Sequence, residues 1–307
     1  MVQKIVIDTD PGIDDAMAIL FACLHPELEL VGLTTVFGNV TGDVAARNAL
    51  VLVDIADQDI DVARGSDVPL VQDAKPYAWE FHGREGFGDL PPREPQGTIS
   101  NLTAAEFLCE TVNRNPGEVV FCAVGPLTNL ADALALDPSI AEAVKSVVVM
   151  GGSLDAGGNV TPAAEANIWQ DPHAANRVFS APWDVTLVGL DVTHQVICSP
   201  ADFAGLARAA PTIGGFLDGA AQYYFEAERN RNGMDGCYLH DPTAVIAVIR
   251  PSWFRHRRAA VAVVETGKRV GATVWADSAV RHPVSVCVGV EADNVRRCFL
   301  ETIRSGF

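Results

Sequence analysis

The sequence is short of basic residues. Its 307 residues include 22 Lys and Arg against 39 Asp and Glu, which gives a formal net charge of −17 at pH 7. Nucleic acids and anionic membrane surfaces attract proteins that carry excess positive charge. The composition therefore argues against either as the main partner. It leaves open that part of the negative charge surrounds a cation.

Paired cysteines and long apolar runs are also missing. The seven cysteines show no CxxC spacing, and several lie in apolar runs such as VVFCAVG, which is typical of buried free thiols. We therefore expect neither a disulfide framework nor a zinc site. No apolar run reaches the length of a membrane span, and the opening MVQKIVIDTD enters a strand pattern at once. These features predict a cytoplasmic protein.

Apolar residues are abundant, at 49% of the chain. Short runs typical of buried strands occur at 4–8, 28–36, 118–125, 146–152 and 184–192, with further strands expected around 259–290. Helical periodicity occurs at 13–24, 42–56, 101–115, 127–136, 213–231 and 241–249, whereas 64–100 is irregular. This alternation predicts a single α/β domain over 1–307, with a mostly parallel central sheet flanked by helices. Ligands bind such sheets at the carboxyl ends of the strands.

Four carboxylates crowd the first of these strand ends, in the stretch IDTDPGIDDAMAI. Asp8 and Asp10 end a strand, and Asp14 and Asp15 fall in the first turn of the next helix. Acids at a helix start complement the helix dipole, which accounts for one or two of them. Four crowded carboxylates would repel one another. A hard cation with oxygen ligands, Ca²⁺ or Mg²⁺, removes that difficulty.

Two later stretches carry further candidate residues. In YLHDPTAVIAV, Asp241 and Pro242 are predicted to be the N-cap and first residue of a helix, with His240 directly before them. In AEANIWQDP, Glu165 and Asn167 would point to the same side if the segment is extended. Asp-Pro pairs at 137–138 and 171–172 also open helical patterns, so the dipeptide alone indicates no function.

Together these segments resemble the nucleoside hydrolase family, the inosine–uridine preferring nucleoside N-ribohydrolases. DTDPGIDDAMAI is similar to the N-terminal signature of that family almost letter for letter. Further similar segments follow in the family's order: TTVFGN (34–39), VGPLTNLA (124–131), VVVMGG (147–152), AEANIWQDP (164–172), VGLDVTHQ (188–195) and HDPTAV (240–245). The resemblance implies a Rossmann-like fold with its active site at the carboxyl ends of the strands. It also implies Ca²⁺-dependent hydrolysis of ribonucleosides to ribose and free base.

The resemblance also implies roles for individual residues. Ca²⁺ would be held by three carboxylates and one backbone carbonyl: Asp10, Asp15, Asp241 and Val124. Asp10 would activate the attacking water, and His240 would protonate the leaving base. The ribose would be bound by Asp14, Asn39, His82, Met150, Asn159, Glu165 and Asn167. The family resemblance further implies a homodimer or homotetramer.

Two other functions remain open at this stage. The same residues could form a Ca²⁺-dependent ribose- or nucleoside-binding protein without turnover. A phosphatase of the DxD type is the other, although Gly12 stands where such enzymes usually have a hydroxyl or β-branched residue. The choice of nucleobase is also open, with a lean to broad or pyrimidine-favouring activity. The candidates for base selection are Tyr223, Tyr224, Glu228, Arg229 and Asn232.

Overall fold

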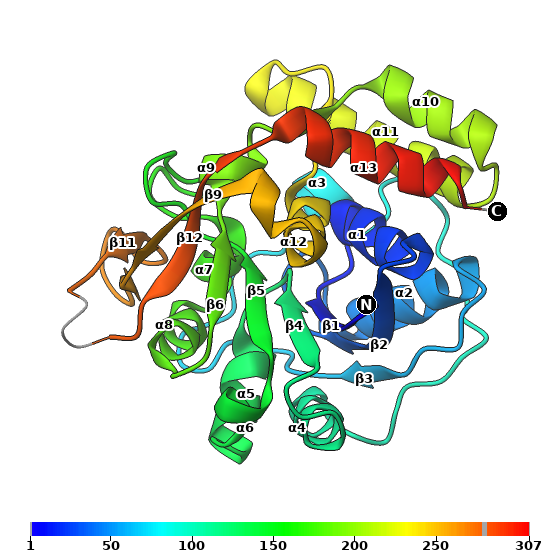
Figure 1. The fold of residues 1–307 in the computed structure, drawn as a ribbon. Coiled ribbons are helices and arrows are strands. Elements are labelled where there is room, and N and C mark those ends of the chain that lie inside the picture. Colours follow the sequence, from blue (N-terminus) through cyan, green and yellow to red (C-terminus); the bar gives the residue numbers. More distant parts are fainter. Residues whose placement is uncertain (1, 278–280, 307) are drawn as a thin grey trace.

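The computed structural model describes residues 2–277 and 281–306 and centres on an eight-stranded sheet (Figure 1). The strand order is β3-β2-β1-β4-β5-β6-β12-β9, and β9 runs antiparallel to β12 whereas the other neighbours pair in parallel. The strands are Gln3–Thr9 (β1), Leu28–Thr35 (β2), Val62–Arg64 (β3), Val119–Ala123 (β4), Ser146–Met150 (β5), Val185–Val188 (β6), Phe254–Ala259 (β9) and Val284–Val290 (β12). The predicted α/β fold with a mostly parallel sheet is confirmed.

Helices cover both faces of the sheet because the strands are apolar on both sides. In β1, Ile5 and Ile7 face one core, and Val6 faces the other. The helices that pack on the first core include Ile13–Leu24 (α1), Gly42–Ile55 (α2), Pro200–Ala209 (α10), Ile213–Asn232 (α11), His240–Ile249 (α12) and Ala292–Arg304 (α13). Those on the second include Ala104–Arg114 (α4), Thr128–Leu136 (α5), Ile140–Ala143 (α6) and Pro172–Ser180 (α8) (Figure 1).

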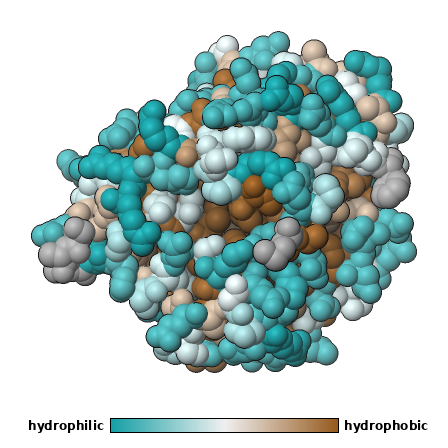
Figure 2. Space-filling model, viewed as in Figure 1, coloured by the Kyte–Doolittle hydropathy of each residue, from teal (hydrophilic) through white to brown (hydrophobic). Residues whose placement is uncertain are grey.

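Shorter elements complete the described part of the chain. The helical ones are Trp79–His82 (α3), Ala166–Gln170 (α7), Leu190–Thr193 (α9) and the 3₁₀ turn Pro251–Trp253 (η1). Two-stranded sheets join Ile197–Cys198 (β7) to Cys237–Tyr238 (β8), and Val261–Val263 (β10) to Thr273–Trp275 (β11). None of the described helices has the length and apolar character needed to cross a membrane. In Figure 2, polar residues cover most of the face in view, with an apolar area near its centre.

The order of the strands reverses at β1. From β1 the chain builds outward through β2 and β3, then returns to place β4, β5 and β6 on the other side. The connections that follow β1 and β4 therefore run in opposite directions from the carboxyl ends of these two adjacent strands. Open α/β sheets bind their ligands at such a switch point. The crowded acidic stretch follows β1, so it lies at this position.

The structure corrects several local predictions. The strand expected at 184–192 ends at Val188, because Gly189 becomes the N-cap of α9. Helix α12 begins at His240 with Leu239 as its N-cap, so Asp241 is not the capping residue. Within 64–100, α3 is the helix found in an otherwise irregular segment. Strands were expected around 259–290, and residues 278–280 of that range lie outside the described part of the chain.

A buried amide joins three strand ends behind the switch point. Asn129, in the first turn of α5, donates from Nδ2 to Asp8 Oδ1 (2.7 Å) and to the Thr35 carbonyl (3.0 Å). Its Oδ1 accepts the N–H of Ser66 (2.9 Å). The side chain thus connects the ends of β1 and β2 to the loop after β3.

Replacing this amide should destabilise the fold. Asn129→Ala leaves the Ser66 N–H without its partner and removes one donor each from the Asp8 carboxylate and the Thr35 carbonyl, which keep the Thr34 hydroxyl and the Gly65 N–H. A lost hydrogen bond costs about 0.5–1.5 kcal/mol, and an unsatisfied buried group costs about 1–3 kcal/mol. We expect the free energy of unfolding, measured by urea denaturation, to fall by about 2–4 kcal/mol. The control is Asn113→Ala, at an exposed position of α4, which should change it by less than about 0.5 kcal/mol. Equal losses in both variants would contradict the role of Asn129.

Candidate active site

The turn between β1 and α1 holds the Asp15 carboxylate in place. Gly12 is the N-cap of α1, and Asp15 accepts its N–H (3.0 Å) and that of Asp10 (3.2 Å). Asp15 also accepts hydrogen bonds from the Thr9 hydroxyl and from Asn39 Nδ2 (3.0 Å). Four donors thus fix this carboxylate at the carboxyl end of β1.

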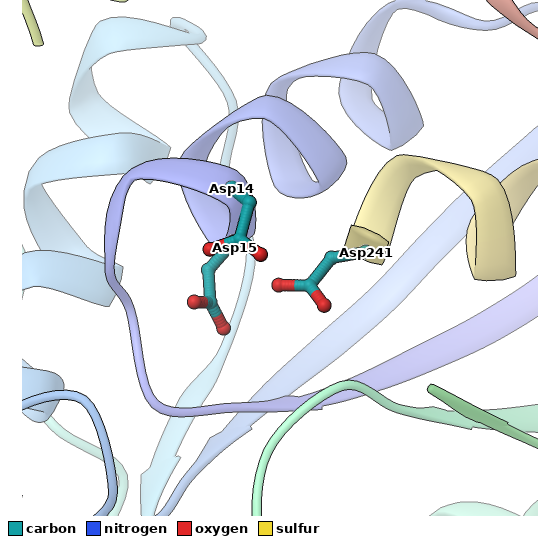
Figure 3. A group of neighbouring side chains, drawn as sticks. All are labelled: Asp14, Asp15 and Asp241. Atoms are coloured by element: carbon teal, nitrogen blue, oxygen red, sulfur yellow. The ribbon is translucent and has the colours of Figure 1, made fainter. Parts of the chain in front are cut away.

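A second helix start, that of α12, brings another carboxylate to the same place. Helix α12 packs against α1, and the Asp241 side chain in its first turn points toward that of Asp14 (Figure 3). Oxygen atoms of Asp14, Asp15 and Asp241 all lie within 4.8 Å of one another. Two predicted metal ligands, Asp15 and Asp241, belong to this cluster, and its third member is Asp14, which was predicted to bind substrate.

Burial and mutual repulsion make these carboxylates unstable as a group of anions. Burial is the largest cause that raises the pKa of Asp10, Asp14 and Asp241 well above its ordinary value, and the neighbouring carboxylates add to it. Asp10 Oδ1 and Asp14 Oδ1 are buried without a hydrogen-bond partner among the described residues. A set of carboxylate oxygens that is crowded and partly unpartnered fits a hard divalent cation, whose charge would reverse this effect.

Glycine on both sides leaves room for the Asp10 carboxylate. A Cβ atom at Gly38 would lie 2.1 Å from Asp10 Oδ2, and one at Gly125 would lie 2.6 Å from Oδ1. Gly38 also has a φ of +156°, which other residues rarely adopt. The N–H of Asn39 donates to Asp10 Oδ2 at 2.6 Å. Backbone after β2 and after β4, the strands on either side of β1, therefore encloses Asp10, and its Oδ1 has no hydrogen-bond partner in the described part of the chain.

Asn167 reaches the ends of two neighbouring strands. Its Nδ2 donates to the Val124 carbonyl after β4 (2.8 Å) and to the Met150 carbonyl at the end of β5 (3.2 Å). The sulfur of Met150 lies 3.5 Å from the same nitrogen. The structure thus brings three predicted site residues together, including the predicted carbonyl ligand.

Glu165 is placed differently from the prediction. The segment is not extended: Glu165 is the N-cap of α7, and its Oε1 accepts the N–H of Asn167 (2.9 Å). Its Oε2 accepts the N–H of Gly152 at 2.8 Å, which ties it to the loop after β5. Asn159 supports the same helix start, because its Oδ1 accepts the N–H of Ala166 (3.0 Å). Both residues therefore lie beside Asn167 because they accept backbone N–H groups at the start of α7. The spacing in the sequence did not indicate this.

The two predicted histidines are buried and neutral. His82 Nδ1 accepts the N–H of Ile13 (3.1 Å) and lies 3.9 Å from Asp14 Oδ1, and burial lowers its pKa to about 3. His240 Nδ1 lies 2.8 Å from the Thr193 hydroxyl. Burial, followed by the nearby His194 and His82, lowers the pKa of His240 to about 3 as well.

The sequence did not single out three residues that support the site. Thr9 donates to Asp15, Thr193 contacts His240, and the His194 ring lies 5.6 Å from the His240 ring. All three stand inside motifs quoted for other reasons, DTDPG and VGLDVTHQ. A hydroxyl group that hydrogen-bonds to another side chain, or a ring that packs near one, leaves no periodic pattern in the sequence.

A parallel α/β sheet with a buried carboxylate cluster at its switch point defines an enzyme scaffold with a candidate divalent-metal centre. The sequence profile of the inosine-uridine preferring nucleoside hydrolase family matches residues 5–297. The chain belongs to this family, and it is accordingly a nucleoside hydrolase, which cleaves N-glycosidic bonds.

Relatives match the chain over most of its length. It is 42% identical to uridine nucleosidase 1 of Arabidopsis thaliana, over 95% of this chain and 90% of that protein. It is 38% identical to the inosine-uridine preferring nucleoside hydrolase of Crithidia fasciculata, over 89% and 88%. Among solved structures, the plant nucleoside hydrolase PpNRh1 superposes with a TM-score of 0.96 at 37% identity, covering 99% of this chain and 100% of that one.

A bound cation should stabilise the folded protein. Adding a divalent cation to the metal-stripped protein is expected to raise Tm, because ligand at 100 times Kd stabilises the folded state by about 2.7 kcal/mol. Differential scanning fluorimetry measures this shift. Asp241→Asn should reduce it strongly, whereas Asp59→Asn, at an exposed position between α2 and β3, should preserve it. A shift that is unchanged in Asp241→Asn would place the cation elsewhere.

Proposed function

We propose that the chain hydrolyses ribonucleosides to ribose and free nucleobase with Ca²⁺ as its cofactor. The observation that carries this proposal is the buried cluster of Asp14, Asp15 and Asp241, with Asp10 beside it, at the switch point of the sheet. The names of two relatives, a uridine nucleosidase and an inosine-uridine preferring hydrolase, support the substrate class. The resemblance to the family supports a homodimer or homotetramer.

Three carboxylates and one carbonyl would hold the Ca²⁺: Asp10, Asp15, Asp241 and Val124. Their oxygens are the donors that this cation prefers. When bound, Ca²⁺ would supply a Lewis acid that orients the ribose hydroxyls and acidifies the attacking water. Carboxylates in excess of the cation's charge keep the site negative, which suits a ribosyl group that becomes cationic as the bond breaks.

Asp10 is the proposed general base. Its Oδ2 is engaged by the N–H of Asn39, and its Oδ1 is buried without a described partner, so Oδ1 can accept a proton from water. Burial raises the pKa of this carboxyl, and a bound cation would oppose that shift and keep Asp10 in the ionised form that a general base needs. Attack by water from the face of the ribose opposite the nucleobase would invert the configuration at C1′.

The remaining predicted residues would hold the ribose and the leaving base. The 2′- and 3′-hydroxyls would be bound by Asp14 of the cluster, by Asn39, which donates to Asp15, and by Asn167, which donates to the Val124 carbonyl. Glu165, Asn159 and His82 would lie at the 5′ end, and Met150 at the reacting face. The Thr193 hydroxyl holds His240 Nδ1, which leaves Nε2 as the ring nitrogen for the leaving base. A neutral ring with its proton on Nε2 can donate to that base.

The first test is the release of reducing sugar from inosine, uridine and cytidine. We expect release from at least one of these nucleosides by the Ca²⁺-loaded protein. The rate should fall to background after dialysis against EDTA, because the carboxylates lose their cation, and should return when Ca²⁺ is restored. Sugar release that survives EDTA would contradict the cofactor. Saturable binding of nucleoside without any release would favour the binding-protein alternative.

The general base has a test of its own. Asp10→Asn keeps the size of the side chain and removes the proton acceptor, so kcat should fall by about 10²–10⁴-fold. Nucleoside binding, measured by calorimetry at matched Ca²⁺, should change by less than about tenfold. Asp59→Asn again serves as the exposed control. Turnover near the normal rate in Asp10→Asn would rule out the assigned role.

A further inference from the structure

The loop that joins β5 to α7 brings Asn159 and Glu165 to the start of α7. Asn159 Oδ1 accepts the N–H of Ala166, and Glu165 Oε1 accepts that of Asn167. A long loop keeps a single course only where other segments of the protein bind it. The position of Asn159 therefore depends on what holds the stretch of loop that leads to it.

One carboxylate of α9 binds this stretch. Asp191 accepts the N–H groups of three successive loop residues: Leu154 (2.9 Å), Asp155 (2.7 Å) and Ala156 (3.0 Å). The N–H of Leu190, one residue earlier in α9, donates to the Gly152 carbonyl at 2.9 Å. Hydrogen bonds to an ionised acceptor are stronger than those between neutral groups. Asp191 thus supplies the strongest of the contacts between α9 and the loop.

A second segment fixes the residue before these three. The buried Thr273 hydroxyl of β11 accepts the N–H of Ser153 (2.7 Å) and donates to the Ser153 carbonyl (2.8 Å). After the anchored stretch the loop turns at Gly157, which has a φ of +78° and lies two residues before Asn159. The anchored backbone therefore sets the direction from which the chain reaches Asn159.

The same short helix also contacts the other side of the site. Thr193, two residues after Asp191, lies 2.8 Å from His240 Nδ1 through its hydroxyl. Helix α9 thus binds the loop after β5 with one side chain and the start of α12 with another. Thr193 already has a place in the proposed mechanism, whereas Asp191 has none.

We propose that Asp191 is a positioning residue for the substrate, which acts by holding the loop that carries Asn159 against the 5′ end of the ribose. The inference rests on the proposed function, which places Asn159 at that end, and adds a residue that does not touch the substrate. Without the Asp191 carboxylate, three successive N–H groups lose their acceptor, and the loop no longer holds Asn159 in one place. A displacement of about 1 Å in such a group can lower the rate about 10²-fold.

The test compares uridine with 5′-deoxyuridine in Asp191→Ala. The ratio of kcat/KM for uridine to that for 5′-deoxyuridine should fall about 10- to 100-fold, because only uridine has the hydroxyl that the loop would bind. Both nucleosides would release a reducing sugar, so one assay measures both. A smaller fraction of folded protein would lower the two values equally and leave their ratio unchanged.

The matched control is Asp155→Ala. It removes an exposed carboxylate from the same loop and keeps the N–H that Asp191 accepts, so the ratio should stay as in the wild-type protein. Should Asp191→Ala not fold, Asp191→Asn keeps the shape of the side chain and one acceptor oxygen. In that variant the ratio should fall by a smaller factor.

The outcomes separate this inference from the proposed function. If the ratio is unchanged in the Asp191 variants, or if the wild-type protein cleaves uridine and 5′-deoxyuridine equally well, the inference is wrong and the hydrolase proposal stands. If the Ca²⁺-loaded wild-type protein releases no sugar from uridine, inosine or cytidine, the proposed function fails, and the inference with it.

Discussion

The mutual repulsion of buried carboxylates is the constraint on which the rest of this site depends. Asp10, Asp14 and Asp241 are almost without solvent exposure, and burial, followed by neighbouring carboxylates, raises the pKa of each. In the absence of a cation, such a group costs the fold free energy. The surrounding structure holds the carboxylates in place nonetheless, through four donors to Asp15 and a glycine on each side of Asp10. We interpret this strain as the cost of a preformed cation site.

The sheet topology explains why these groups can meet. A parallel sheet places the carboxyl ends of its strands at one edge, and the reversal at β1 opens that edge for a ligand. The acidic stretch needs only to follow β1 to reach this position. In the same way, Asn39 follows β2, Val124 follows β4, and Met150 is the last residue of β5. The neighbouring strands thus supply backbone and side chains to one site.

The histidines show that burial can outweigh nearby negative charge. His82 lies 3.9 Å from a carboxylate oxygen, which would favour its protonation, yet burial lowers its pKa to about 3. The ring instead accepts a backbone N–H at the start of α1. His240 is likewise neutral, and Thr193 fixes one of its nitrogens. In a site that is both acidic and buried, burial and hydrogen-bond partners determine the protonation of these rings more than the nearby negative charge does.

The sequence by itself determined the α/β class, most strands and helices, and the acidic turn after β1, because these depend on periodicity and on neighbours in the chain. The Asp-Pro dipeptide occurs three times and did not by itself distinguish Asp241, which was singled out by the preceding His240 and by the family resemblance. Asp171 caps α8, and Asp137 precedes a turn at the surface, but the Asp241 carboxylate joins a cluster formed more than 200 residues earlier in the chain. Only the packing of α12 against α1 decides this. The same holds for Glu165 and Thr193, because contacts between distant segments exist only once the sheet and helices have assembled.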